Sequence, residues 1–369
     1  MSKKTARKPT RASVKRQTAK TTRRPARKTE SRRSASRTTG TAAALNAGPV
    51  TLAEARGLAI ATTPAAAAGI AKPAPSPAAV GRERERLERE QDEERRRRIR
   101  EYTATLKIMK ARGVKGLGAV AASPLQIFAE GDSWFEYPVP GFGGGIITRL
   151  ERRLGVPILN LAKAGDEVRY MLGVKERQII AAQFTTGCPA GGPWDAMLFS
   201  GGGNDIVDNP MALWIRDYDP VLSPAQQINR PRLEAAFAIV RAGYEDLIAL
   251  RNVLSPATHI FLHAYDFAIP DGRKVCYLGP WLKPTFDLRG FPDLASATAV
   301  TRVMLEQFAA MLQSVANTHR NVTLINAQGT LAPVPASWHN ELHPARAGFN
   351  TFADIFRERL KQAFPGRFL

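Results

Sequence analysis

Apolar residues gather in short runs from about residue 124 to the C-terminus. Five of these runs are rich in aliphatic and β-branched side chains, which is typical of strands buried on both faces. Longer stretches between them have the spacing of helices. The predicted strands cover 125–129, 157–161, 196–200, 259–264 and 322–326, and the predicted helices cover roughly 145–154, 166–184, 230–254, 295–319 and 347–363.

Alternation of strands and helices predicts an α/β domain whose parallel sheet is covered by helices on both faces. In such sheets ligands bind beyond the carboxyl ends of the strands. Glycine and polar residues stand at these positions here. They are GDSW at 131–134, AGD at 164–166, GGGND at 201–205, HAYD at 263–266 and, before the last helix, WHNELHP at 338–344.

The chain before this domain has no such pattern. Residues 1–40 contain fifteen Lys or Arg and one acid, a net charge of +14, and residues 41–80 are rich in Ala, Pro and Thr. A segment with so little apolar area cannot offset the entropy of ordering, so 1–80 is predicted to be a disordered basic and Ala/Pro-rich tail.

Residues 81–112 contain strong helix formers, with no Pro and no Gly after Gly81, and they alternate Glu with Arg. Pairs such as Glu94 and Arg98 are four residues apart, in the order that stabilises a helix. Because apolar residues are sparse, we expect a charged helix whose faces are solvated, not a coiled coil.

Charge and cysteine content narrow the function classes. The whole chain of 369 residues has a net charge of +20, yet residues 121–369 have 23 basic and 23 acidic residues and are neutral. The basic character therefore belongs to the N-terminal part.

Two cysteines exclude a disulfide scaffold. The sequence has no apolar run long enough for a membrane-spanning helix, and no apolar segment of a secretory signal follows the basic start.

The residues at the strand ends suit acyl transfer. A serine hydroxyl needs a neighbouring base, which His343 can supply to Ser133. The reaction forms an oxyanion, which needs fixed hydrogen-bond donors. The backbone N–H groups of Ser133 and Gly165 and the side-chain amide of Asn204 can provide them.

Four ordered blocks resemble those of the SGNH (GDSL-type) serine hydrolase superfamily: GDSW at 131–134, NLAKAGD at 160–166, GGND at 202–205 and ELHP at 341–344. The resemblance covers about 124–364. It implies a flavodoxin-like three-layer α/β/α fold and hydrolysis of ester, acetyl or thioester bonds through an acyl-enzyme. It also implies that Ser133 is the nucleophile, His343 the general base, and Ser133, Gly165 and Asn204 the oxyanion hole, and that Asp132 is not the catalytic acid.

The sequence departs from that pattern at one position. The superfamily places Asp three residues before the catalytic His, and this chain has Asn340 there. A neutral amide stabilises an imidazolium less than a carboxylate does and can favour the wrong tautomer. The alternatives are that Glu341 orients His343, or that a Ser–His dyad operates with a backbone carbonyl as the partner of the imidazole.

Two long connections, 206–229 and 266–292, contain aromatic residues, Tyr277 among them, near the strand ends. They suit a binding wall or lid, or else simply cover the edge of the sheet. The expected substrate contacts are Trp134, His263 and Trp281, and a structural role is the alternative for His263. The histidine spacing fits no metal motif and the glycines fit no nucleotide fingerprint, so no cofactor and no metal is expected.

The sequence leaves two functions of different classes open. The first is a serine esterase that acts on a small ester or acylated substrate in the cytoplasm. The second is a binder of nucleic acid or another polyanion, acting through residues 1–40 without sequence specificity, with a weak or inactive hydrolase-like domain. The second would associate the chain with the nucleoid. An organelle transit peptide is a third interpretation of the Arg- and Ser-rich start.

Overall fold

The computed structural model describes residues 77–112, 124–275 and 279–367. Its centre is a sheet of five parallel strands in the order β2-β1-β3-β4-β5. The strands are nearly completely buried, because helices cover both faces of the sheet. Most of their side chains are therefore apolar. Their bounds are β1 Ile127–Gly131, β2 Ile158–Asn160, β3 Ala196–Ser200, β4 His259–Ala264 and β5 Val322–Asn326.

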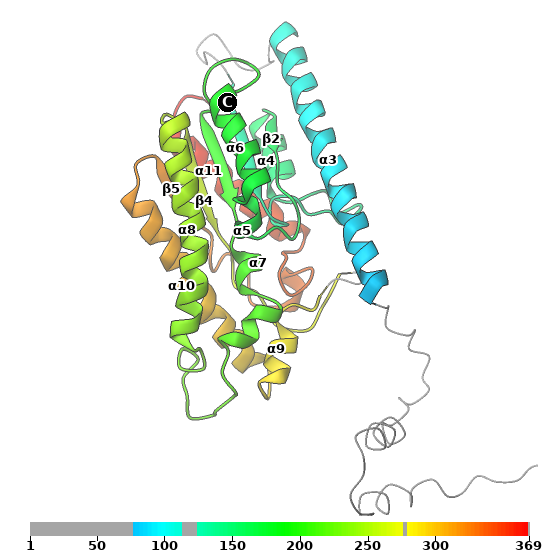
Figure 1. Cartoon of the computed structure of the whole chain (residues 1–369), viewed down its shortest axis with the longest axis vertical. Helices are drawn as coiled ribbons and strands as arrows, with labels where there is room; N and C mark the ends of the chain where they lie inside the picture. The colour runs from blue at the N-terminus through cyan, green and yellow to red at the C-terminus, as the bar shows by residue number, and fades with distance from the viewer. Residues whose placement is uncertain (1–76, 113–123, 276–278, 368–369) are drawn as a thin grey trace, which may run out of the picture. The chain divides into compact units, whose positions relative to one another are not determined.

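Helices pack in two groups on the sheet. Helices α4 and α11 pack against each other, and α8 packs against α5, α6 and α10. Figure 1 shows α6 and α8 in front of the sheet and α11 behind it, so the architecture is a three-layer α/β/α sandwich. The bounds are α4 Ile146–Leu154, α5 Val168–Met171, α6 Val174–Thr186, α7 Gly203–Ile206, α8 Arg230–Leu254, α9 Lys283–Leu288, α10 Leu294–Thr318 and α11 Arg346–Ala363, with 3₁₀ turns at Asn209–Leu213 and Pro335–Ser337.

The fold class predicted from the sequence is confirmed. Three of the five strands have the predicted bounds, and the other two differ by one or two residues at each end. The predicted helix over 166–184 is wrong in one respect, because it divides into α5 and α6. Gly173 lies at the break with an extended backbone and caps the start of α6. The connection over 266–292 contains a short helix, α9, and another short helix, α7, ends where the connection over 206–229 begins; neither helix was predicted.

Helix α3, Pro77–Arg112, corrects the expectation of a solvated helix over 81–112. It begins four residues earlier than predicted, and one of its faces is buried. Arg95 and Tyr102 are each only 5% exposed. Arg98 pairs with Glu136 near the sheet instead of with Glu94 on its own helix. Rules for charge pairs within one helix cannot predict such contacts, because the partner residues are distant in sequence.

The basic tail predicted over 1–80 falls mostly on residues 1–76, which lie outside the described residues. The expectations of disorder and of nucleic-acid binding therefore stay predictions. Within the described ranges, no helix is both long enough and apolar enough to span a lipid bilayer.

Candidate active site

The sheet brings the four sequence blocks together at one edge. GDSW follows β1, NLAKAGD runs out of β2, GGND follows β3, and ELHP precedes α11. Because all five strands are parallel, their carboxyl ends lie on the same side. Residues separated by more than 200 positions are therefore in contact there.

Ser133 and His343 form a direct hydrogen bond. The distance from Ser133 Oγ to His343 Nε2 is 2.6 Å, and both side chains are at least nine-tenths buried. Ser133 lies in the turn that follows β1. The carboxylate of Asp132 accepts a hydrogen bond from the backbone N–H of Trp134 at 3.0 Å and fixes that turn. The serine therefore has the reach that proton transfer to a base requires.

The side-chain oxygen of Asn340 determines which tautomer His343 adopts. Asn340 Oδ1 accepts hydrogen bonds from the backbone N–H groups of Leu342 and His343, each at 2.9 Å. An atom that accepts from two amides must be the oxygen, and it lies 3.0 Å from His343 Nδ1. Nδ1 therefore has the proton and donates to Asn340, and Nε2 is left as the acceptor for the Ser133 hydroxyl.

Tyr137 holds the other end of the Asn340 side chain. Asn340 Nδ2 donates to the Tyr137 hydroxyl at 3.0 Å, and that hydroxyl lies 2.6 Å from Nδ1 of His339. Asn340 is fully buried. Both the oxygen and the nitrogen of its side-chain amide therefore have hydrogen-bond partners. If the amide were flipped, its NH₂ group would point at the two backbone N–H groups, and both would lose their acceptor. Neither Tyr137 nor this role for His339 was expected from the sequence.

Burial lowers the pKa of His343 to about 3, with a smaller contribution from His339. Aromatic rings surround the imidazole: the Tyr137 ring centroid is 4.6 Å away and that of Trp281 is 6.0 Å away. His343 is therefore a neutral base at neutral pH. A positive charge that forms on it during proton transfer faces two π-systems.

Of the three residues expected to form the oxyanion hole, Ser133 and Asn204 line one cavity, and Asn204 contacts the loop that contains Gly165. Gly165 has a φ of +85°, which favours glycine, and a side chain placed there would meet open space. Asn204 Nδ2 donates to the backbone oxygen of Asp166 at 2.9 Å, which ties β3 to the loop containing Gly165. Among the described residues, neither the Ser133 nor the Gly165 backbone N–H donates a recorded hydrogen bond. Both are free to receive an acceptor from a substrate.

Glu341 does not contact the imidazole. Its fully buried carboxylate accepts four backbone N–H groups, at 2.5–3.0 Å, from Gly272, Trp281, Leu282 and Lys283. Burial raises its pKa while these hydrogen bonds lower it. Of the two residues expected to orient His343, Asn340 therefore contacts the ring, and Glu341 binds the backbone at Gly272 and at 281–283.

The three residues expected to contact substrate lie at different depths. Trp281 neighbours His343. Trp134 borders the cavity beside Ser133, and its ring packs among Tyr265, Phe352 and other aromatic rings. His263 is fully buried, bonds Ser200 Oγ through Nδ1 at 3.0 Å, and has a pKa lowered to about 3 by burial. Its surroundings match the structural alternative.

A small apolar cavity of about 30 Å³ touches Ser133, Asn204 and His343. Both long connections contribute residues to the wall of this cavity. Tyr277 lies outside the described residues. The apolar wall comes from Val207, Ala268, Leu282, Met304, Leu305 and Leu342. Met304 and Leu305 lie in the predicted helix over 295–319, but nothing in the sequence indicated that they face a cavity.

The low pKa of His343 predicts an unusual pH profile. Below its pKa the imidazole is protonated and cannot accept the Ser133 proton, so activity is lost as pH falls through that value. With a pKa of about 3, kcat/KM for a p-nitrophenyl ester should stay flat from about pH 8 to about pH 5. Asn340→Asp places a carboxylate against Nδ1 and raises the pKa. Its profile should fall toward acid from near neutrality.

The measurement compares kcat/KM of the wild type and Asn340→Asp across this pH range, with near-UV circular dichroism at each pH as the control for folding. Identical profiles would contradict the position assigned to Asn340.

Comparisons with known proteins yield structural neighbours only. No family model matches the chain, and no curated protein matches its sequence. The chain is similar to the lipase Lip_vut3 from a goat rumen metagenome, with 15% identity over 63% of this chain and 96% of that one and a TM-score of 0.41. It is similar to the carbohydrate acetylesterase Est24 from Sinorhizobium meliloti, with 12% identity, 65% and 100% coverage and a TM-score of 0.39. It is also similar to phospholipase A1 from Streptomyces albidoflavus, with 14% identity, 64% and 99% coverage and a TM-score of 0.40. This chain thus combines a parallel sheet in the order β2-β1-β3-β4-β5 with four blocks at its carboxyl edge that resemble those of SGNH (GDSL-type) hydrolases.

Proposed function

We propose that this chain is a serine hydrolase that cleaves esters of short acyl groups through an acyl-enzyme. The observation that supports it most directly is the contact of Ser133 Oγ with His343 Nε2 at 2.6 Å, together with the Asn340 oxygen that fixes the ring. A nucleophile, a base and a group that orients the base thus lie in hydrogen-bond reach of one another.

In the first half of the reaction, Ser133 Oγ attacks the carbonyl carbon of the ester and His343 Nε2 takes the hydroxyl proton. The negative charge on the carbonyl oxygen meets the backbone N–H groups of Ser133 and Gly165 and the amide of Asn204. His343 then gives its proton to the leaving alcohol. In the second half, water repeats the attack on the acyl-enzyme, and Ser133 recovers its proton.

A neutral third member can support this cycle. Asn340 Oδ1 accepts the Nδ1 proton of His343 both before and after Nε2 is protonated. Because Asn340 is neutral, it does not stabilise the imidazolium as a carboxylate would. The rings of Tyr137 and Trp281 supply part of the missing electrostatic stabilisation. A Cys–His–Asn arrangement in an unrelated hydrolase fold shows that an amide can fill this place.

The cavity beside Ser133 supports a short acyl group. A volume of about 30 Å³ holds roughly two water-sized groups. The wall near the nucleophile is apolar and buried, and it includes Leu282 and Met304. An acetyl or propionyl group fits such a space, whereas a long chain does not.

Ser133→Ala should abolish ester turnover and labelling by a fluorophosphonate, because the attacking oxygen is lost. His343→Ala should cost a comparable factor, since nucleophile and base act as one unit and their losses do not add. Mass spectrometry of the labelled peptide checks the site, with thermal unfolding as the control. Labelling of Ser133→Ala at another serine, with an unchanged rate, would rule out the assignment.

Asn204→Ala should lower kcat by about 10²–10³, which is roughly 3–4 kcal/mol, with little change in KM. The reason is that the amide meets a full charge only in the transition state. Steady-state kinetics on p-nitrophenyl acetate measure both constants. An effect confined to KM would instead mean that Asn204 binds the ground state.

Acyl-chain length provides a separate prediction. The kcat/KM for p-nitrophenyl acetate should exceed that for the octanoate by more than about a hundredfold, because a longer chain must displace packed side chains. Met304→Ala enlarges the cavity and should shift the preference toward butyrate. Its folding is checked by thermal unfolding, since such truncations cost about 2–5 kcal/mol. An octanoate preference in the wild type would refute the short-acyl assignment.

Binding of nucleic acid or another polyanion through residues 1–40 is a second candidate activity. Its support is the concentration of charge, +14 in this segment against a neutral 121–369. It concerns a different part of the chain and does not depend on the hydrolase proposal.

A further inference from the structure

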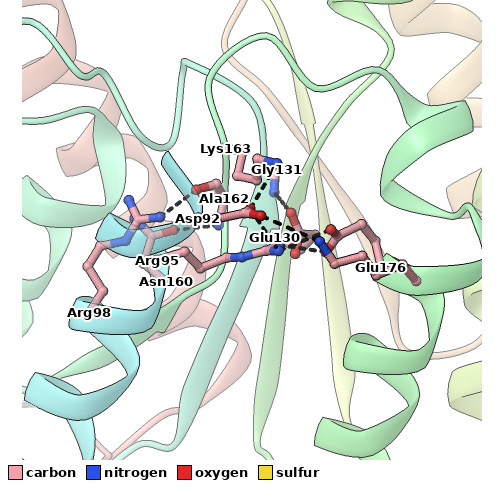
Figure 2. A network of polar contacts seen from close by, with 10 residues as sticks. Asp92, Arg95, Arg98, Glu130, Gly131, Asn160, Ala162, Lys163 and Glu176 are labelled. Carbon is pink, nitrogen blue, oxygen red and sulfur yellow. Dashed lines mark hydrogen bonds and ion pairs between the residues drawn. The ribbon is translucent and has the colours of Figure 1, made fainter. Parts of the chain in front are cut away.

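Helix α3 precedes the sheet in the chain and lies outside the stretch that the hydrolase blocks cover, yet it contacts the active-site loop. It packs along β2, which is an edge strand of the sheet. Figure 2 shows the side chains of Asp92, Arg95 and Arg98 reaching from α3 toward the ends of β1 and β2. The loop that contains Gly165 begins at this point.

Two contacts attach α3 to that loop. The Arg98 guanidinium donates to the backbone oxygen of Ala162 at 2.6 Å, and the carboxylate of Asp92 lies 3.2 Å from Lys163 Nζ (Figure 2). Lys163 is only 7% exposed, so water screens this ion pair weakly. These two anchored positions stand three and two residues before Gly165.

The same loop is also held from the sheet side. The backbone N–H of Lys163 donates to Gly131 O at 2.9 Å, and the N–H of Asp166 donates to Lys163 O at 3.3 Å, closing the turn around Gly165. Gly131 directly precedes Asp132 and Ser133 in the chain. The α3 contacts therefore act on the segment that sets the distance between the Gly165 amide and Ser133.

Cations of α3 also compensate buried acids beneath the loop. Arg95 forms two hydrogen bonds with Glu176, at 2.6 and 3.0 Å, and Arg98 forms an ion pair with Glu136 at 2.6 Å. Glu130 is almost fully buried next to them, and burial raises its pKa to about 8 although Arg95 lowers it. Buried acids without such partners would be strongly destabilising, so α3 is bound to this place by charge as well as by packing.

We propose that α3 is a part of the catalytic machinery in which Arg98 and Asp92 are positioning residues that hold the Gly165 amide at the oxyanion. This inference rests on the proposed hydrolase function. The physical reason is that an oxyanion donor must be held to within about 0.5 Å, and supporting residues lock it there. Gly165 has little rigidity of its own at a φ of +85°.

The test uses the full chain with three variants. Arg98→Ala should lower kcat for p-nitrophenyl acetate by about ten- to a hundredfold, while KM stays within about twofold. Asp92→Asn should give a smaller loss in the same direction, and Arg98→Lys, which keeps a donor and the charge, should recover part of kcat. The matched control is Arg96→Ala on the exposed face of α3, which should leave both constants unchanged.

Hydrogen exchange provides a readout that does not need turnover. In Arg98→Ala, amides of the 161–167 segment should exchange faster, while those of β4 should not change. Unaltered exchange in 161–167, or an unaltered kcat in both Arg98→Ala and Asp92→Asn, would overturn the proposal. If Arg98→Ala unfolds globally, kcat and the exchange of 161–167 in Asp92→Asn and Arg98→Lys decide whether the proposal holds. If the wild type turns over no ester, the hydrolase function fails, and the exchange result still decides whether α3 holds the loop.

Discussion

The geometry of the Ser133–His343 pair depends on one acceptor, the amide oxygen of Asn340. Two backbone N–H groups hold that oxygen, and Tyr137 holds the nitrogen at the other end. A carboxylate in the same place would be a further buried charge, which needs partners of its own. The neutral amide avoids that cost but leaves His343 a weak base. A weak base transfers charge less readily, so more of the catalysis has to come from the oxyanion donors.

The two halves of the site are supported by different kinds of buried charge. On the base side, Glu341 is a buried carboxylate whose four hydrogen bonds come from the backbone N–H groups of Gly272 and of residues 281–283. On the oxyanion side, carboxylates beneath the loop are paired with Arg95 and Arg98 of α3. Both solutions satisfy an ionised group in a place that water does not reach. Each fixes a loop that has little regular structure of its own.

Much of the fold could be predicted from the sequence because its strands are continuous apolar runs, and the run at 196–200 matches β3 residue for residue. The candidate site could be assembled because the blocks lie at strand ends, where parallel topology brings them together. The orientation of Asn340 could not be predicted, since it depends on backbone amides that only the folded turn presents. The docking of α3 was missed because Arg95 and Glu176 are 81 positions apart, beyond any pairing rule within a helix.

Burial of the charged face of α3 also determines where the folding unit starts. The strands and all four blocks are contained in residues 124–369, which look from the sequence like a complete domain. Helix α3, which begins at Pro77, nevertheless lies in the same compact unit as the sheet. A chain cut at residue 124 would retain Glu130, Glu136 and Glu176 but lose Arg95 and Arg98. The carboxylates of Glu136 and Glu176 would then have to take up protons or open the edge of the sheet to water, so a helix that contributes no strand belongs to the same folding unit as the sheet.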